Sequence, residues 1–383
     1  MLIGCTRSEI DATPQPRALP PLEPAPIIDT AYIGDGHSNL VISGITSTYK
    51  AGTLIIVKPG TYDKGSGITI ENLSNVTVQL TGVILDGLNK TKPGFYNVLS
   101  LNNLTNVLVT GGTTINNGYK QMYINGKTES LVLKNHTFMN NAQGFAATAG
   151  IVWDGTEQTV FLKNSAIRNC NFINCDGGGN FGEGINAAGQ KVIDLVKNFE
   201  ISGCKWKGGN PGTMFFFSAI DSAFVFNNTI DSVNLNLTND NRLFLFIGNA
   251  EVHNNTVNNI QGHFAAKWAV SFGSTIKTSH YYKNICNGSL KYSAFEFQEF
   301  KEFNIPGKTT SGNLVVSDNI CSNLNTNRFT DFASNFIDNY EYGFMGGKVT
   351  LTNNVGKNFF PVPLPGVFWN LAKPTTVSGN TYQ

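Results

Sequence analysis

The segment Val225-Phe226-Asn227-Asn228-Thr229-Ile230 returns along the chain as Val252-His253-Asn254-Asn255-Thr256-Val257, and this repetition decides the fold. In each copy a short stretch of apolar alternation leads into two asparagines, and another apolar residue follows them. Such alternation indicates a strand, and asparagine both tolerates a left-handed backbone and bonds its neighbours through its amide. The segment therefore predicts short strands joined by a tight turn, repeated along the chain.

An earlier part of the chain, from Gly150 to Gly212, repeats itself at an offset of 34 residues. The matched positions carry small and apolar residues. Among them, Asn164, Ile167 and Cys170 recur as Asn198, Ile201 and Cys204. One such unit cannot bury its apolar side alone, so successive units have to stack on one another. The sequence predicts a solenoid that forms a single domain over residues 31–383.

The turn positions line up at intervals of roughly 24 to 35 residues, within the range of known structural repeats. They are His136, Cys170, Cys204, Asn228, Asn255, Asn284, Asn319, Asn354 and Asn380. Intervals that vary around a constant turn predict one tight corner in every coil and another corner with loops of different length. In a solenoid, such loops are where function concentrates.

The first strands of the predicted solenoid resemble those of a known superfamily. Gly52–Tyr62 reads GTLIIVKPGTY and is followed by ITI at Ile68–Ile70 and VTV at Val76–Val78. Together with the turn segments, these stretches are similar to the right-handed parallel β-helix proteins of the pectate-lyase-like superfamily, over about residues 40–383. The resemblance implies an all-β, single-stranded solenoid of about 10–12 coils, and fold alone assigns no reaction.

Composition excludes one class of partner. Charged residues make up only 14% of the chain, and the formal net charge is +1. A protein that binds nucleic acid needs positive charge to replace the counterions of the phosphates. We therefore expect no nucleic-acid partner. The resemblance implies a polysaccharide instead, with acidic glycans favoured, and a monomeric protein.

The N-terminus carries a separate signal. Leu2-Ile3-Gly4-Cys5 resembles the end of a bacterial lipoprotein signal, in which the cysteine is lipidated. Residues 1–5 are then the remainder of that signal, and residues 6–30 a Pro-rich, extended tether. This resemblance implies a protein of the bacterial cell envelope, with Cys5 as its only membrane anchor, at the outer surface or in the periplasm. A tail or a strap along the solenoid is the alternative for residues 6–30, and no other segment is long and apolar enough to span a bilayer.

Four cysteines fall at equivalent positions of consecutive units, Cys170 with Cys204 and Cys286 with Cys321. An exported protein tolerates disulfides, but stacked thiols also serve as small core residues. We expect buried free thiols. No cysteine spacing indicates a zinc site.

The candidate site lies on the outward residues of the strands that come before each turn segment, which in the resembling enzymes floor a groove for an extended polysaccharide. Alternation in these strands predicts Arg242, Lys267 and Glu296 on an outer row. The residues expected to bind substrate on the same face are Phe216, Phe244, Phe246, Asn186 and Gln298.

The favoured reaction is β-elimination from a polysaccharide that contains uronic acid. Adjacent coils are about 4.8 Å apart, so Arg242 and Lys267 are expected to project side by side, and a neighbouring cation lowers the pKa of a lysine. Lys267 is then the candidate base, and Arg242 the partner of the substrate carboxylate. His263 and Glu296 are further catalytic candidates.

Calcium is a candidate cofactor for the same step, with oxygen ligands from Glu183 and Asp154. Two other functions stay open. A glycoside hydrolase on this fold needs two carboxyl groups, which stacked coils can supply. A glycan-binding or structural β-helix without turnover needs only amides and aromatic rings that face the sugar. The motif series that carry catalysis in pectate lyases and polygalacturonases are absent from the chain.

Overall fold

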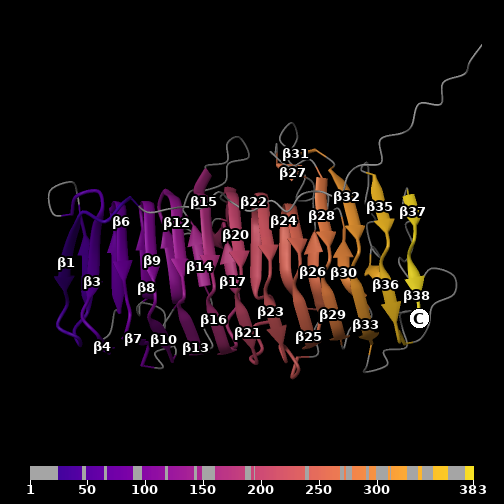
Figure 1. Cartoon of the computed structure of the whole chain (residues 1–383), viewed down its shortest axis with the longest axis horizontal. Coiled ribbons are helices and arrows are strands. Elements are labelled where there is room, and N and C mark those ends of the chain that lie inside the picture. Colours follow the sequence, from indigo (N-terminus) through magenta and orange to yellow (C-terminus); the bar gives the residue numbers. More distant parts are fainter. Residues whose placement is uncertain are drawn as a thin grey trace, which may run out of the picture.

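The computed structural model is a solenoid of parallel strands that advance along one axis in the order of the sequence (Figure 1). The structure describes residues 25–44, 49–63, 67–88, 97–116, 120–141, 145–148, 160–185, 191–193, 195–237, 241–267, 271–272, 278–289, 293–298, 309–310, 312–325, 335–338, 348–360 and 376–383. Every regular element in these ranges is a strand. The predicted all-β parallel β-helix is therefore confirmed.

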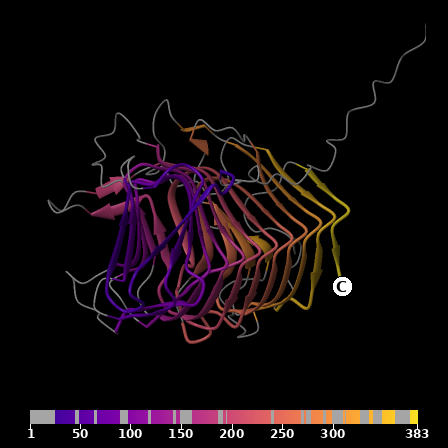
Figure 2. The same ribbon diagram turned by 60° about the vertical axis from the view of Figure 1, so that its left-hand side comes forward.

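Each coil has three strand positions, and these build three faces along the solenoid (Figure 2). The first face contains β2 (Leu40–Ser43), β5 (Ile68–Glu71), β8 (Asn97–Asn102), β11 (Lys120–Asn125), β14 (Phe145–Thr148), β17 (Gly179–Phe181), the first halves of β22 (Phe215–Phe226) and β24 (Arg242–His253), β26 (His263–Lys267), β30 (Ser293–Phe297) and β34 (Asn335–Asp338).

The second face follows the first in each coil from β2 onward, and β1 (Asp29–Ile33) lies before it at the start of the solenoid. The second face contains β1, β3 (Thr53–Val57), β6 (Ser74–Gln79), β9 (Thr105–Thr110), β12 (Thr128–Lys134), β15 (Val160–Arg168), β20 (Leu195–Ser202), the second halves of β22 and β24, β28 (Thr278–Tyr282), β32 (Asn313–Ser317), β35 (Val349–Thr352) and β37 (Thr376–Ser378). Because β22 and β24 run through both faces, the first and second faces join there without a loop.

The third face is a separate sheet of 12 strands. It contains β4 (Gly60–Tyr62), β7 (Val83–Asp86), β10 (Thr113–Ile115), β13 (Thr137–Asn141), β16 (Asn171–Cys175), β21 (Lys205–Lys207), β23 (Thr229–Asp231), β25 (Thr256–Ile260), β29 (Ile285–Ser289), β33 (Ile320–Leu324), β36 (Val355–Lys357) and β38 (Thr381–Tyr382). This number agrees with the coil number that the resemblance implied.

The turn between the second and third faces is the tight corner that the sequence predicts. Its first residue has a positive φ, 56° at Asn227 and 54° at Asn254, which asparagine adopts at low cost. Its second residue points inward and is buried. All of the turn positions that the sequence aligns occupy this corner in the structure, so that alignment is confirmed.

The inward asparagines of this corner form a continuous ladder. Asn284 Nδ2 donates to Asn319 Oδ1 at 2.9 Å and to the Val252 carbonyl at 2.9 Å, while Asn284 Oδ1 accepts from Asn255 Nδ2 at 2.9 Å. The same contacts repeat from Asn228 to Asn380. Because buried amides are costly unless bonded, each rung fixes the spacing and register of the next coil.

The core is filled by inward rows that stack from coil to coil. One row is Ile167, Ile201, Val225, Val252, Tyr281, Val316 and Leu351. Aromatic residues stack in the same way, with the rings of Phe172 and Trp206 4.3 Å apart. The described cysteines, among them the four at matched positions, are buried and free, as expected.

Phe244 and Phe246 belong to this core, so the prediction that they face outward is wrong. Their register partners are Phe215 and Phe217, and both pairs of rings stack at 5.8 Å. Burial in β24 does not alternate, since every residue from Leu243 to His253 is buried, so the direction of these two rings is set by their register with Phe215 and Phe217. Phe216, by contrast, lies on the outward parity and is half-buried.

Two insertions carry short antiparallel pairs between the first and second faces. β18 (Glu183–Ile185) pairs with β19 (Lys191–Ile193), and β27 (Ser271–Phe272) pairs with β31 (Thr309–Thr310). The β27 strand also contacts β22 and β24. Loops therefore vary at this corner while the asparagine corner stays constant, as predicted from the spacing.

The first described coil begins slightly earlier than the predicted boundary, because β1 starts at Asp29, inside the stretch predicted as a tether. Residues 1–24, which include Cys5, lie outside the described residues. The described part contains no helix of the length and apolarity that crossing a bilayer requires.

Candidate functional site

A buried carboxylate marks the outer side of the first face. Register places Phe216, Leu245, Ala266 and Glu296 in one outward row across four consecutive coils. The Glu296 side chain is wholly buried in spite of its outward direction. A buried charge is costly unless it is paired and hydrogen-bonded, so its partners decide what it can do.

Arg242 is the principal partner of Glu296. Its Nε donates to Glu296 Oε2 at 2.7 Å, and Nη2 lies 2.6 Å from the same oxygen. The other oxygen, Oε1, accepts from Gln298 Nε2 at 2.8 Å. Charge-assisted hydrogen bonds of this length are among the strong ones in proteins and fix the carboxylate in place.

His263 and Ser293 extend this network. The distance from His263 Nε2 to Glu296 Oε2 is 3.4 Å, and His263 Nδ1 lies 2.7 Å from Ser293 Oγ. Both side chains are completely buried. Arg242, His263, Ser293, Glu296 and Gln298 form what we call the Glu296 cluster, in which an arginine and an amide bind the carboxylate and an imidazole lies close to it.

The structure brings together four residues that the sequence marks as candidates, namely Arg242, His263, Glu296 and Gln298. The predicted neighbours Arg242 and Lys267 are not a pair, because Arg242 is in register with His263. Strand β26 begins at His263, so Lys267 lies at its end. The backbone of Lys267 is in register with Phe246 and Phe297, two core residues. The expectation of two adjacent cations is therefore wrong.

The calcium hypothesis rests on residues of which little is described. Asp154 and Asn186 lie outside the described residues, and Glu183 is placed only by its backbone, in β18. In the described part of the chain, no cluster of three or more His, Cys, Asp or Glu side chains is arranged to hold a metal ion. Calcium binding stays a prediction.

The second face carries polar groups that the sequence analysis missed. Glu200 accepts from Arg168 Nε at its Oε1 and from Arg168 Nη2 at its Oε2, both at 2.7 Å, and from Ser202 Oγ at 2.6 Å. Lys197 Nζ lies 3.6 Å from Asp221 Oδ2. The strands that directly precede the turn segments are these second-face strands. The strands in which the sequence predicts the site lie on the first face, one corner earlier in the coil.

A row of aromatic rings lies beside these groups. The ring of His253 stacks between Phe226, at 5.0 Å, and Tyr282, at 4.7 Å. These three residues directly precede the turn in consecutive coils, so counting back one residue from each turn would have located them. Burial lowers the pKa of His253 to about 4, with a further contribution from Lys283. Burial also raises the pKa of Tyr282 to about 12, and the charge of Glu251 adds to that shift.

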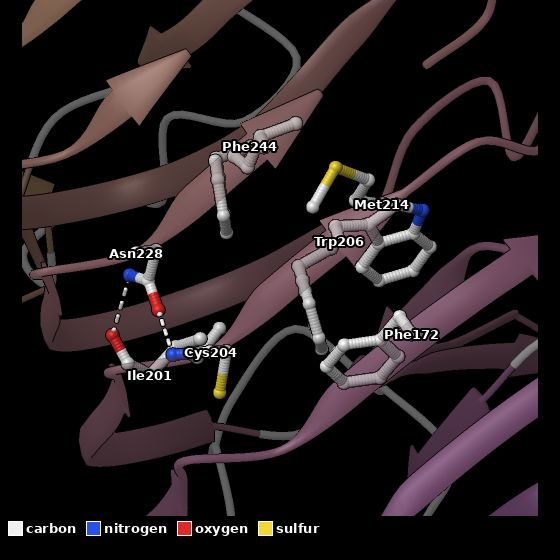
Figure 3. Close-up of a pocket in the computed structure, with 9 residues that line it drawn as sticks. Phe172, Ile201, Cys204, Trp206, Met214, Asn228 and Phe244 are labelled. Atoms are coloured by element: carbon white, nitrogen blue, oxygen red, sulfur yellow. Dashed lines mark hydrogen bonds between the residues drawn. The ribbon is translucent and has the colours of Figure 1, made fainter. Parts of the chain in front are cut away.

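The cavity shown in Figure 3 belongs to the core and not to a site. Its volume is about 10 Å³, which is room for about one water molecule. Apolar side chains such as Phe172, Met214 and Phe244 line it, and Asn228 of the ladder closes one side through hydrogen bonds to the Ile201 carbonyl and the Cys204 amide. A sugar cannot enter it.

Comparison with known proteins supports the fold but identifies no reaction. No family model matches the chain, and no curated protein does either. A family 28 exopolygalacturonase from Yersinia enterocolitica gives a TM-score of 0.50 at 11% identity, over 87% of this chain and 73% of that protein. A tailspike protein mutant of E. coli bacteriophage HK620, in complex with a pentasaccharide, gives 0.53 at 13%, over 86% of this chain and 60% of that one.

These likenesses define a class by fold. The chain is a right-handed parallel β-helix protein, as both the stacked parallel sheets and the solved structures show. It spans less than two thirds of the tailspike chain. Identities this low show shared architecture only, so the reaction has to be argued from the residues of this chain.

Proposed function

We propose that this protein binds a polysaccharide along the first face and hydrolyses a glycosidic bond there, with Glu296 as one of the two carboxyl groups that the reaction needs. The observation that carries this proposal is the position of Glu296 on an outward row, held through both oxygens by Arg242 and Gln298. Glycosidases use a carboxylate oriented in this way as nucleophile or base.

The second carboxyl group is expected from a neighbouring coil. Register partners in adjacent parallel strands are about 4.8 Å apart, close to the separation of about 5–5.5 Å in retaining glycosidases. The register position beside Glu296 in the next coil is that of Asp338 in β34. Asp338 is therefore the first candidate for the partner, and retention of configuration the expected outcome.

The geometry favours hydrolysis over the β-elimination that the sequence suggested. A lyase needs a cation for the substrate carboxylate, and the guanidinium of Arg242 is already bound to Glu296. Lys267, the predicted base, is not the register neighbour of Arg242. Elimination from an acidic glycan is kept as the alternative that the experiment has to separate.

The test is a panel of neutral and acidic polysaccharides, assayed both for new reducing ends and for the ultraviolet absorbance of unsaturated uronates. Hydrolysis predicts reducing ends without that absorbance. Glu296→Gln and Asp338→Asn should each lower the rate about 10²–10⁴-fold, the range for loss of a general acid or base. Glu129→Gln is the matched control, because Glu129 pairs with Lys163 at the surface of the second face and should keep full activity.

Three results would contradict the proposal. Absorbance that grows with the reducing ends would assign a lyase. Full activity of Glu296→Gln would remove this residue from the chemistry. Binding of a polysaccharide without any cleavage by the native protein would assign a glycan-binding protein instead.

We also infer where the protein acts. The Leu2–Cys5 segment and the Pro-rich stretch after it support anchoring at the bacterial cell envelope through a lipidated Cys5. Metabolic labelling with a fatty acid tests this in the full chain. Label should enter the native protein and be lost in Cys5→Ser, while Cys170→Ser, at a buried core thiol, should keep it.

A further inference from the structure

Each ring nitrogen of His263 lies beside oxygen atoms that accept hydrogen bonds. The side chain stands at the start of β26 and is completely buried. Nε2 lies 3.4 Å from Glu296 Oε2, while Nδ1 lies 3.2 Å from the Ser293 carbonyl oxygen and 2.7 Å from Ser293 Oγ. An ionised carboxylate and a carbonyl oxygen accept hydrogen bonds and donate none.

The Ser293 hydroxyl is the one group of these three that can also donate, and its hydrogen has an acceptor elsewhere. Ser293 Oγ donates to the Phe295 carbonyl at 3.2 Å. A serine hydroxyl has one hydrogen and two lone pairs, so Oγ is left to accept from His263 Nδ1. A neutral imidazole carries a single N–H and can serve only one of its two sides.

The other contacts of Glu296 favour its ionised form. Arg242 Nε donates to Glu296 Oε2 at 2.7 Å, and Gln298 Nε2 donates to Oε1 at 2.8 Å. Hydrogen bonds donated to a carboxylate stabilise the charged state, and a neighbouring cation does so as well. The oxygen that faces His263 therefore carries negative charge.

The charged groups packed around the imidazole come from two strands. β24 supplies Arg242, which disfavours a second positive charge, and β30 supplies Glu296, which favours it. β25 also packs against β26, and its sequence has no ionisable residue. On β26 itself, Lys267 lies at the opposite end of the strand. The two acceptors at Nδ1 add to the effect of Glu296, so the balance favours the charged ring.

We propose that His263 is doubly protonated in the folded protein and is a positioning residue, which together with Arg242 holds Glu296 as an ionised carboxylate. The consequence for catalysis rests on the proposed function. Glu296 is then the nucleophile or base of the hydrolysis, and the second carboxyl group, for which Asp338 is the candidate, has to supply the proton.

The test is nitrogen-15 NMR of the full chain labelled at histidine, at neutral pH. His263, assigned by the loss of its signals in His263→Gln, should show two ring nitrogens that each carry a proton. His136 and His253 are internal controls with one protonated nitrogen each, because burial lowers the pKa of both to about 4. In Glu296→Gln, His263 should lose one of its two protons, whereas Glu129→Gln, at an exposed ion pair, should leave it unchanged.

A second measurement follows stability with pH. A histidine that gains an anionic partner on folding keeps its proton to a higher pH than the unfolded chain, which loses it near pH 6.5. The contribution of His263 is therefore complete below about pH 6.5 and is lost as the pH rises through the deprotonation of the folded ring. Urea midpoints between about pH 6 and pH 9 should fall more steeply for the native protein than for His263→Gln, whose amide does not titrate.

Three results would overturn the proposal. A single protonated nitrogen in His263 at neutral pH would assign the Ser293 hydroxyl as the donor to a neutral ring. An unchanged His263 spectrum in Glu296→Gln would show that the carboxylate does not hold the second proton. Equal slopes of the urea midpoints in the native protein and in His263→Gln would do the same for the linkage to stability. Neither measurement uses a polysaccharide, so a failure of the proposed hydrolysis is distinguishable from a failure of this inference.

Discussion

Arg242 Nη2 lies 2.6 Å from Glu296 Oε2, although their strands are not neighbours in the sheet. Strand β26 lies between β24 and β30, so the guanidinium reaches across a whole coil. The outward residue of the coil in between is Ala266, whose methyl group leaves room for the arginine. The bridge joins three coils into one unit, and it places the positive charge of Arg242 on the carboxylate itself.

Removal of Arg242 should therefore destabilise the protein strongly. In Arg242→Ala the wholly buried Glu296 loses its cation, and breaking a buried pair costs about 3–5 kcal/mol. Urea unfolding at neutral pH measures the loss. Glu296→Gln in the same chain should recover part of it, because the uncompensated charge is then gone. A double variant that costs as much as the two single losses added together would show that the residues do not act as a pair.

The asparagine ladder predicts a position-dependent cost for the same substitution. Asn284→Ala removes a rung that bonds both neighbours and the Val252 carbonyl, and should lower the free energy of unfolding by about 3 kcal/mol. Asn380→Ala removes the last, half-exposed rung, where water replaces the lost bonds, and should cost about 1 kcal/mol. Equal costs in denaturant melts would mean that the ladder is not cooperative.

His136 predicts a loss of stability in acid. It lies at the ladder position of an earlier coil, bonded to Thr114 Oγ1 at 2.6 Å and to the Gly111 carbonyl at 2.8 Å, and burial lowers its pKa to about 4. The unfolded chain, with a pKa near 6.5, binds the proton first. Stability is therefore complete above about pH 6.5 and falls as the pH drops toward 4, by about 3 kcal/mol for this residue.

The measurement for His136 is a series of urea midpoints between pH 4 and pH 7. His136→Asn places the residue of the later coils at this position and should flatten the slope by about that amount. A variant whose stability falls with acid as steeply as that of the native protein would locate the acid sensitivity elsewhere.

Two phenylalanines of one predicted set should behave differently. Phe244 stacks on Phe215 in the core, so Phe244→Ala should cost about 3–5 kcal/mol of unfolding free energy. Phe216 is half-buried on the outer row, so Phe216→Ala should cost about 1 kcal/mol and reduce polysaccharide affinity instead. Thermal melts and affinity electrophoresis separate the two effects. A severe loss of stability in Phe216→Ala would place this ring in the core as well.

The fold could be predicted from the sequence because the turn chemistry repeats. A residue that accepts a positive φ, then an inward residue that is His or Cys in the earlier coils and Asn from Asn228 on, marks the same corner in coil after coil, and the structure confirms each aligned position from His136 to Asn380. Strand parity was harder to predict. The coils around Phe244 have no turn of their own between the first and second faces, so no residue fixed the count there, and an error of one residue reversed the expected direction of the ring.

The sequence predicts only some of the site, because it does not show the register between coils. Polarity in apolar strands indicates Arg242 and Glu296, His263 is a loop candidate for proton transfer, and the structure brings the three together. Their partnership depends on register across three coils, which loops of variable length hide from the sequence. The His253 and Tyr282 pair was missed because each residue looks like an ordinary end of a strand, and only stacking shows that their polar edges share one row.

At the tight corner each asparagine donates from Nδ2 to the asparagine Oδ1 of the coil after it and accepts at its own Oδ1 from the coil before it. The contacts that a coil makes above and below at this corner are therefore the same for every coil that has asparagine there. A whole coil can be copied or deleted between Asn228 and Asn380 with the joints preserved. The length of the solenoid can therefore change by one coil at a time, without a change in the contacts at this corner.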